Sequence, residues 1–265
     1  MEDPVPAGTW VRRHALATRL WHWANAAVLA GLLMSGLMIF NAHPRLYWGE
    51  YGANFDVPWL EIGAIGERGA VSLGGRTFDT TGVLGVSRGA DGSPVALAFP
   101  EWATIPSTYN LADGRLWHLG LAPLLVALWC GYGAWMVAGG HLKRNLWPRN
   151  GEWKPAHIAR DVLDHLRLRF GSGVRYNILQ KLAYLAVLLV LLPLVIVTGL
   201  AMAPGMDAAW PWLTEVWGGR QSARSVHFLC ASGLVGFFIV HIVMVVLAGP
   251  VREVRAMVTG WWRVR

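Results

Sequence analysis

Residues 226–241, VHFLCASGLVGFFIVH, place a histidine near each end of a strongly apolar stretch. His227 and His241 are 14 residues apart. In an α-helix this spacing corresponds to about 21 Å along the axis and to a rotation about 40° short of four full turns. The two imidazoles therefore share one face of the predicted helix, near its opposite ends. They are too far apart to bind one ion, so each needs its own partner.

The composition indicates an integral membrane protein. Apolar residues make up 54% of the 265 residues and charged residues only 15%, whereas about a quarter of a soluble domain is charged. The 16 Trp residues agree, because Trp is enriched where membrane meets water. Each of four apolar runs has about the 20 residues that a membrane-spanning helix needs: about 20–40, 116–138, 179–202 and 225–248. We expect an all-α bundle of four transmembrane helices.

The basic residues predict the orientation of this bundle. Of the 23 Lys and Arg residues, 16 lie before the first helix, between 143 and 181, or after 250. The positive-inside rule then places both termini and the loop 139–178 in the cytoplasm, and the loop 41–115 outside. Such a chain is expected in a bacterial inner membrane, with the outer loop in the periplasm. The net charge of +7 thus indicates a lipid surface and not nucleic acid.

The loops have patterns of their own. The segment 70–87, AVSLGGRTFDTTGVLGVS, predicts a short hairpin around its Gly-Gly step. The segment 155–170 and the tail 251–265 each carry apolar residues on one helical face, in the tail up to Trp261. Both are expected to be amphipathic helices that lie at the membrane surface.

The predicted depth of each histidine gives two pairs. The first helix runs outward, so His22 in TRLWHWANA lies near the inner side, beside His241. The second and fourth helices run inward, so His118 in GRLWHLG lies near the outer side, beside His227. Ionisable groups inside a membrane are costly and tend to be functional. Two stacked pairs in a four-helix bundle fit the axial ligands of two b-type haems.

Other interpretations of these histidines stay open. Zinc is the rival metal, but its sites usually hold three or four protein ligands. His43 could compete for the outer site, whereas His141 lies too far along its helix. The remaining His14, His157 and His165 fall in basic segments expected to face water. Two arginines near the pairs, Arg19 and Arg115, could bind haem propionates or anchor the helices at the interface.

The motifs RLWHWANA, a His at the start of the second helix, and H-x13-H in the fourth resemble those of a known family. It comprises the di-haem cytochrome b membrane subunits of Ni,Fe-hydrogenase, formate dehydrogenase and thiosulfate reductase. The segments YNLADGRLWH and RYNILQKLAYL further resemble the thiosulfate-reductase-type branch. The resemblance implies haem ligation by His22, His118, His227 and His241.

The resemblance also implies a function. Its members relay electrons between quinone and an oxidoreductase partner outside the membrane, in this branch a molybdopterin enzyme. The quinone is expected near the inner haem, where Asn25 and Asn177 are candidate contacts. The chain would then be one subunit of an enzyme complex. Two alternatives are a self-contained superoxide:quinone oxidoreductase and a haem-free membrane anchor.

Overall fold

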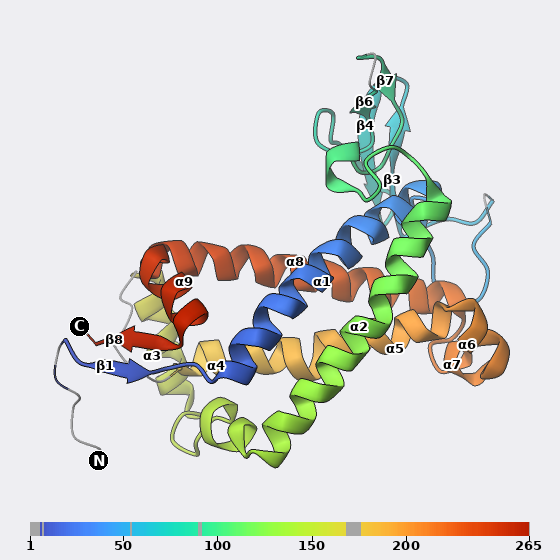
Figure 1. The fold of residues 1–265 in the computed structure, drawn as a ribbon. Coiled ribbons are helices and arrows are strands. Elements are labelled where there is room, and N and C mark those ends of the chain that lie inside the picture. The colour runs from blue at the N-terminus through green and yellow to red at the C-terminus, as the bar shows by residue number, and fades with distance from the viewer. Residues whose placement is uncertain (1–5, 7, 54, 90–91, 168–175, 265) are drawn as a thin grey trace. The chain divides into compact units, whose positions relative to one another are not determined.

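The computed structural model describes residues 6, 8–53, 55–89, 92–167 and 176–264 (Figure 1). Long helices dominate it: α1 (Leu16–Ala42), α2 (Leu111–Ala138), α4 (Ile178–Ala186) continued by α5 (Leu192–Met202), and α8 (Arg220–Ala248). In the described part of the chain, four helical spans are long and apolar enough to cross a membrane. The predicted set of four apolar helices is therefore present.

Local chemistry sets the ends of these helices. Asn110 caps α2 by accepting the amide of Asp113 at 3.1 Å on its side-chain oxygen. At the other end of α2, Gly140 takes a left-handed φ of 65°, a conformation that glycine adopts at no steric cost. α8 ends before Gly249, which also has a positive φ, of 109°, and Pro250 is the first residue of the next helix, α9 (Pro250–Thr259).

The third span contains a turn of π-helix, η3 (Val187–Leu191), directly before Pro193. Proline has no N–H and its ring displaces the preceding turn, so the carbonyls of that turn lose regular partners. The carbonyl of Leu188 instead accepts a hydrogen bond from Trp129 Nε1 at 2.9 Å. The backbone irregularity is thus satisfied by a side chain, as a segment in lipid requires.

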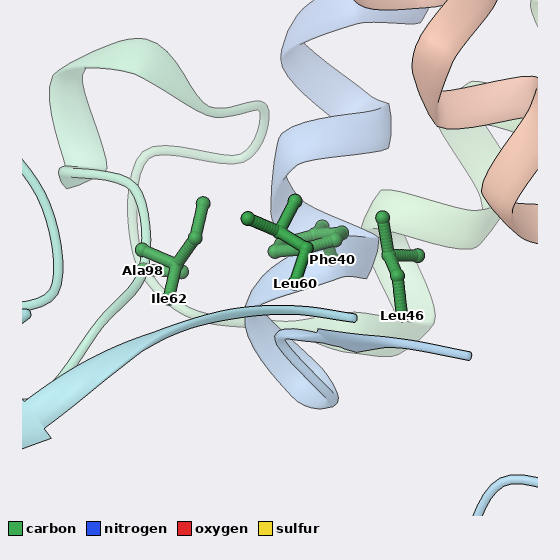
Figure 2. Packing of buried hydrophobic residues seen from close by; sticks show 5 residues of the cluster. All are labelled: Phe40, Leu46, Leu60, Ile62 and Ala98. Atoms are coloured by element: carbon green, nitrogen blue, oxygen red, sulfur yellow. The ribbon is translucent and has the colours of Figure 1, made fainter. Parts of the chain in front are cut away.

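Shorter elements occupy the connections. The segment between α1 and α2 holds a four-stranded antiparallel sheet in the order β2 (Arg45–Leu46), β3 (Leu60–Ile65), β4 (Arg68–Leu73), β5 (Arg76–Asp79). It also holds the paired strands β6 (Ser87–Arg88) and β7 (Pro94–Val95) and the 3-10 turn η1 (Glu101–Ala103). The predicted hairpin is confirmed: β4 and β5 pair around Gly74 and Gly75. Phe40 at the end of α1 packs into this sheet with Leu46, Leu60, Ile62 and Ala98 (Figure 2).

The remaining elements are η2 (Leu142–Leu146, a π-turn), α3 (Pro155–Leu166), α6 (Pro204–Ala209), α7 (Trp212–Glu215), α9 (Pro250–Thr259) and β8 (Trp261–Arg263). α3 and α9 occupy the two segments predicted as amphipathic helices, but residues 168–170 of the first prediction lie outside the described residues. The prediction that Trp261 continues the second helix is wrong. Gly260, at φ 86°, ends α9, and Trp261 begins β8, which pairs with β1 (Trp10–Arg12).

The chain divides into two compact units. The first unit comprises residues 1–25, 127–193 and 232–265, and the second comprises 26–126 and 194–231. The first unit therefore includes His22 and His241, and the second includes His118 and His227. Each predicted histidine pair falls within a single unit, and the two pairs are described separately below.

Candidate haem-ligand pairs

In the second unit, the imidazoles of His118 on α2 and His227 on α8 face each other. Their ring centres are 6.2 Å apart and their planes are inclined by 65°. A metal atom between two imidazole nitrogens, with bonds of about 2.0 Å, separates the ring centres by roughly 6 Å. The spacing of this pair therefore fits one metal ion held between two histidines.

The other ring nitrogen of His118 is already engaged. His118 Nδ1 lies 3.1 Å from the carbonyl oxygen of Leu32 and 3.0 Å from Ser35 Oγ. A carbonyl can only accept, so Nδ1 carries the proton and donates. In a neutral imidazole this leaves the lone pair on Nε2 free to bind a metal.

His227 has the same arrangement. Its Nδ1 lies 3.0 Å from Thr198 Oγ1. The single hydroxyl proton of Thr198 is donated to the carbonyl of Leu194, 2.6 Å away. The hydroxyl oxygen can therefore only accept from His227, which again assigns the proton to Nδ1 and the lone pair to Nε2.

In the first unit, His22 on α1 and His241 on α8 form a second pair. Their ring centres are 6.3 Å apart with an interplanar angle of 57°. Phe237 stacks on His241 at 5.7 Å, and Trp23 meets His22 edge-on at 5.0 Å. This spacing fits a metal ion between the two rings, as does the 6.2 Å spacing of His118 and His227. His22 Nδ1, however, is buried without a hydrogen-bond partner among the described residues.

Several glycines on the same helices face open space. A Cβ built at Gly120 in the second unit, or at Gly131, Gly133 or Gly236 in the first, would meet no atom within 4 Å. Others are needed for close packing: a Cβ at Gly31 would lie 2.6 Å from Leu121 Cδ1. The open glycines lie on exposed or half-buried helix faces, so the fit to a haem rests on the two imidazole pairs and their ring spacings of 6.2 and 6.3 Å.

Zinc fits less well. Within the described ranges, no group of three or more His, Cys, Asp or Glu side chains could hold a metal ion. A protein zinc site normally has at least three such ligands. Each pair offers two imidazoles, the number that a six-coordinate haem iron requires.

The two predicted arginines lie in different surroundings. Arg19 donates from Nη1 to the carbonyl of Val258 on α9, while its Nε is buried without a partner in the described part of the chain. Arg115 is exposed near the start of α2. Arg19 thus ties α1 to the C-terminal helix, an arrangement that leaves only part of its guanidinium for another ligand.

The two candidate asparagines also differ. Asn177 caps α4: its side-chain oxygen accepts a hydrogen bond from the backbone N–H of Gln180 at 2.8 Å. The side-chain oxygen of Gln180 accepts one from the backbone N–H of Asn177 at 3.2 Å. Asn25 is 7% exposed, and its Oδ1 has no partner among the described residues. An unpaired buried oxygen is unfavourable unless a ligand completes it. Asn25 is therefore the better candidate for a ligand contact.

Two of the remaining histidines have contacts of their own. His43 packs its ring on Tyr47 at 5.8 Å, and His141 contacts Asn145 through Nδ1 at 2.9 Å. His157 lies on α3, and the side chain of His165 lies outside the described residues.

The prediction that His14 faces water is wrong. His14 is 7% exposed, with Tyr176 Oη 3.3 Å from its Nδ1. Burial, together with the charge of nearby Arg13, lowers the pKa of His14 to about 4. Sequence reasoning missed this cluster because the contact joins positions 162 residues apart.

Sequence reasoning also missed Ser35 and Thr198. Both are fully buried hydroxyl residues in apolar helices. Each precedes a glycine, in SG at 35–36 and TG at 198–199, and a polar residue in a membrane helix is itself a signal of function.

Four apolar spans and two closely spaced histidine pairs fit the class of membrane-embedded b-type cytochromes. Residues 13–260 match the family described as Prokaryotic cytochrome b561, and the chain belongs to that family. It is therefore a multi-pass membrane protein of a haem b family that transfers electrons.

The chain is also similar to a curated protein of Azospira oryzae, the putative protein-methionine-sulfoxide reductase subunit YedZ1. The two are 32% identical over 152 residues, 57% of this chain and 72% of that protein. No solved structure matches the chain.

Proposed function

We propose that this protein is a quinone-linked di-haem b subunit, which relays electrons between the quinone pool and an oxidoreductase partner outside the membrane. The observation that carries the proposal is the presence of two facing histidine pairs, with ring centres 6.2 and 6.3 Å apart. In this proposal His118 and His227 hold the outer haem, and His22 and His241 hold the inner one. Haem supplies a one-electron ferric/ferrous couple when bound.

The residues of this chain would bind the haems and exclude water from them. His118 and His227 would hold iron through Nε2, because their Nδ1 protons are donated within the protein. His22 and His241 would hold the second iron. The apolar helices exclude water, which strengthens the polar contacts around each ligand. Arg115 and the unpaired Nε of Arg19 are the side chains proposed for haem propionates.

Quinone is proposed to bind near the inner haem, beside Asn25. Asn25 lies three residues after His22 on α1, and its buried Oδ1 lacks a partner in the described part of the chain. A carbonyl oxygen there would accept the hydroxyl proton of a quinol. Asn25→Leu should raise the KM for quinol several-fold while leaving the haem spectrum intact, whereas Asn177→Asp, which keeps the helix cap, should change neither.

The partner is proposed to dock on the segment between α1 and α2. A hollow of about 620 Å³ there is lined by four aromatic residues, Tyr47, Trp48, Tyr51 and Trp59, and by acidic Glu50 and Asp56. This lining fits a partner surface with basic and apolar side chains. The hollow is tied to the ligand-bearing helix, because Trp59 Nε1 donates to Ser225 Oγ at 2.9 Å, two residues before His227.

A matched pair of tryptophans tests the docking proposal. Trp48→Ala should weaken electron transfer to the partner and leave the haem spectra unchanged. Trp102 is 82% exposed in the same segment but lies outside the hollow, so Trp102→Ala should have little effect. Equal effects of the two substitutions would contradict docking at the hollow.

The relative is named as a subunit of a sulfoxide reductase. This supports a catalytic partner for the present chain as well, and we propose a molybdopterin-dependent one, as in the thiosulfate-reductase-type branch. The basic residues support an inner-membrane protein with both termini in the cytoplasm. Reporter fusions at Arg265 and in the segment 92–99 should therefore report opposite sides of the membrane.

One experiment tests the function as a whole. The purified protein, in detergent, is mixed with a short-chain quinol without oxygen, and its visible spectrum is followed. Reduction of both haems, reversed by added quinone, is the expected result. A protein whose haem neither accepts electrons from quinol nor returns them to quinone is not a quinone-linked carrier.

A further inference from the structure

The histidines of the second unit are each backed by a hydroxyl residue followed by glycine. Behind His118, Ser35 Oγ lies 3.0 Å from Nδ1, and a Cβ added to Gly36 would lie 3.4 Å from the ring carbon Cε1. The hydroxyl fixes the ring nitrogen together with the carbonyl of Leu32, which lies 3.1 Å from Nδ1. The missing side chain of Gly36 lets the ring edge approach the backbone of α1. The two-residue step Ser35–Gly36 therefore sets both the rotation of the His118 imidazole and its distance from the backbone of α1.

The same step occurs behind His227, on a different helix. Thr198 Oγ1 lies 3.0 Å from Nδ1 of His227. A Cβ added to Gly199 would lie 3.3 Å from Cε1. Thr198 and Ser35 are both fully buried, and each also bonds the carbonyl four residues earlier in its own helix, at 2.6 and 2.7 Å. The two steps are equivalent in chemistry although they are far apart in sequence.

In the described part of the first unit, no hydroxyl residue is bonded to the ring nitrogens of His22 and His241. His22 Nδ1 is buried with no hydrogen-bond partner among the described residues. His241 packs against the face of Phe237, with the two rings inclined by 12°. Both pairs have nearly the same ring spacing, so they differ in the polar contacts behind the ring and not in the room between the rings.

We propose that Ser35 and Thr198 are positioning residues that tune the iron bound between His118 and His227, an inference that rests on the proposed haem function. An imidazole that donates its Nδ1 proton to a fixed oxygen is a more basic ligand at Nε2. A more basic ligand stabilises ferric over ferrous iron. The two hydroxyls therefore lower the potential of the one-electron ferric/ferrous couple at this pair, while the proton stays on Nδ1.

The test compares removal of each hydroxyl with its conservation. Ser35→Ala and Thr198→Val remove the oxygen, whereas Ser35→Thr and Thr198→Ser keep it. Thr104→Val is the matched control, because Thr104 is a buried hydroxyl whose only partners among the described residues are the carbonyls of Glu101 and Pro106, at 3.1 and 3.0 Å. All five variants are purified with haem, and each haem's potential and its ferric low-spin EPR signal are measured.

Ser35→Ala and Thr198→Val should raise the potential of one and the same haem. We expect about a tenfold change in its ferric-to-ferrous ratio at fixed ambient potential, equivalent to about 59 mV for one electron. Its EPR signal should shift too, while the conservative variants and Thr104→Val stay near the wild type. Haem loss in the removal variants that the conservative variants rescue would also support the proposal.

Two results would overturn it. Unchanged potentials in Ser35→Ala and Thr198→Val with both haems bound would show that the hydroxyls do not tune the iron. An equal shift in Thr104→Val would show that any buried hydroxyl acts alike. Both results would leave the proposed function standing, whereas wild-type protein without haem would refute the proposed function and this inference together.

Discussion

His118 and His227 lie on two different helices with their ring centres 6.2 Å apart, and each has its Nδ1 bonded to a buried hydroxyl. With Nδ1 as the donor, both Nε2 lone pairs are free for a metal. The ring spacing and the free lone pairs therefore fit one metal ion held between the two histidines.

The pairing predicts which substitutions act together. Replacing His118 or His227 by Ala should abolish the same haem component in spectra and redox titrations. Replacing His22 or His241 should abolish the other component, because their rings form the second facing pair at 6.3 Å. Difference spectra of the four purified variants check this. A variant of His22 that removes the same component as a variant of His227 would contradict the pairing.

The contacts behind the rings predict the order of the two potentials. Bonding at Nδ1 makes His118 and His227 the more basic ligands, so the haem that they hold should have the lower midpoint potential. A redox titration of the wild type gives two components, and the His227→Ala variant identifies one of them. If the component lost in His227→Ala is the higher one, another influence outweighs these hydrogen bonds.

Gly199 should be intolerant of even one methyl group. A Cβ there would lie 3.3 Å from His227 Cε1, so the ring would have to give way. Gly199→Ala should therefore shift the spectrum or potential of the haem held by His227. Gly205 is the control, because a Cβ there meets nothing within 4 Å. Haem analysis of both variants should show a change only in Gly199→Ala, and a normal spectrum in that variant would argue against the close fit.

His14 predicts a pH dependence of stability. Its pKa falls from 6.5 to about 4 on folding, mainly through burial and then through the charge of Arg13. Between these two values the unfolded chain binds more protons than the native one, so stability is lost as pH falls from about 6.5 to 4. The loss from this residue is at most about 3 kcal/mol.

The measurement is thermal unfolding of the purified protein at pH 7.5 and pH 5, compared with His14→Gln. The variant should lose less stability on acidification than the wild type does. Comparing the two proteins at each pH cancels other groups, such as Glu253, whose pKa burial raises. Parallel losses in wild type and variant would show that His14 does not carry this dependence.

Helical periodicity and membrane depth predicted the four spans and suggested which histidines could meet. Apolar runs of about 20 residues specify helices, and the 14-residue spacing of His227 and His241 places them on one face. Local patterns failed where tertiary pairing decided the outcome. His14 is buried in contact with Tyr176, which is far away in the sequence. Helix α9 ends at Gly260, which has a positive φ, and Trp261 pairs with β1 as part of a strand.

The support behind the ligands could not be predicted either. No sequence spacing links Ser35 to His118 or Thr198 to His227. Each contact joins two different helices, and only the packing of these helices brings the two side chains to the same depth. The π-turn before Pro193 is a similar case. The proline predicts an irregular backbone, but the indole of Trp129 that donates to the carbonyl of Leu188 comes from another helix.

The central claim is that the chain binds two haems through these four histidines. Pyridine haemochrome analysis of the purified protein, with the polypeptide quantified by amino-acid analysis, measures it most directly. We expect about two b-type haems per chain, and about one in each single histidine-to-alanine variant. A wild-type value near zero would contradict the redox function, and wild-type retention of haem in all four variants would contradict the assignment of the ligands.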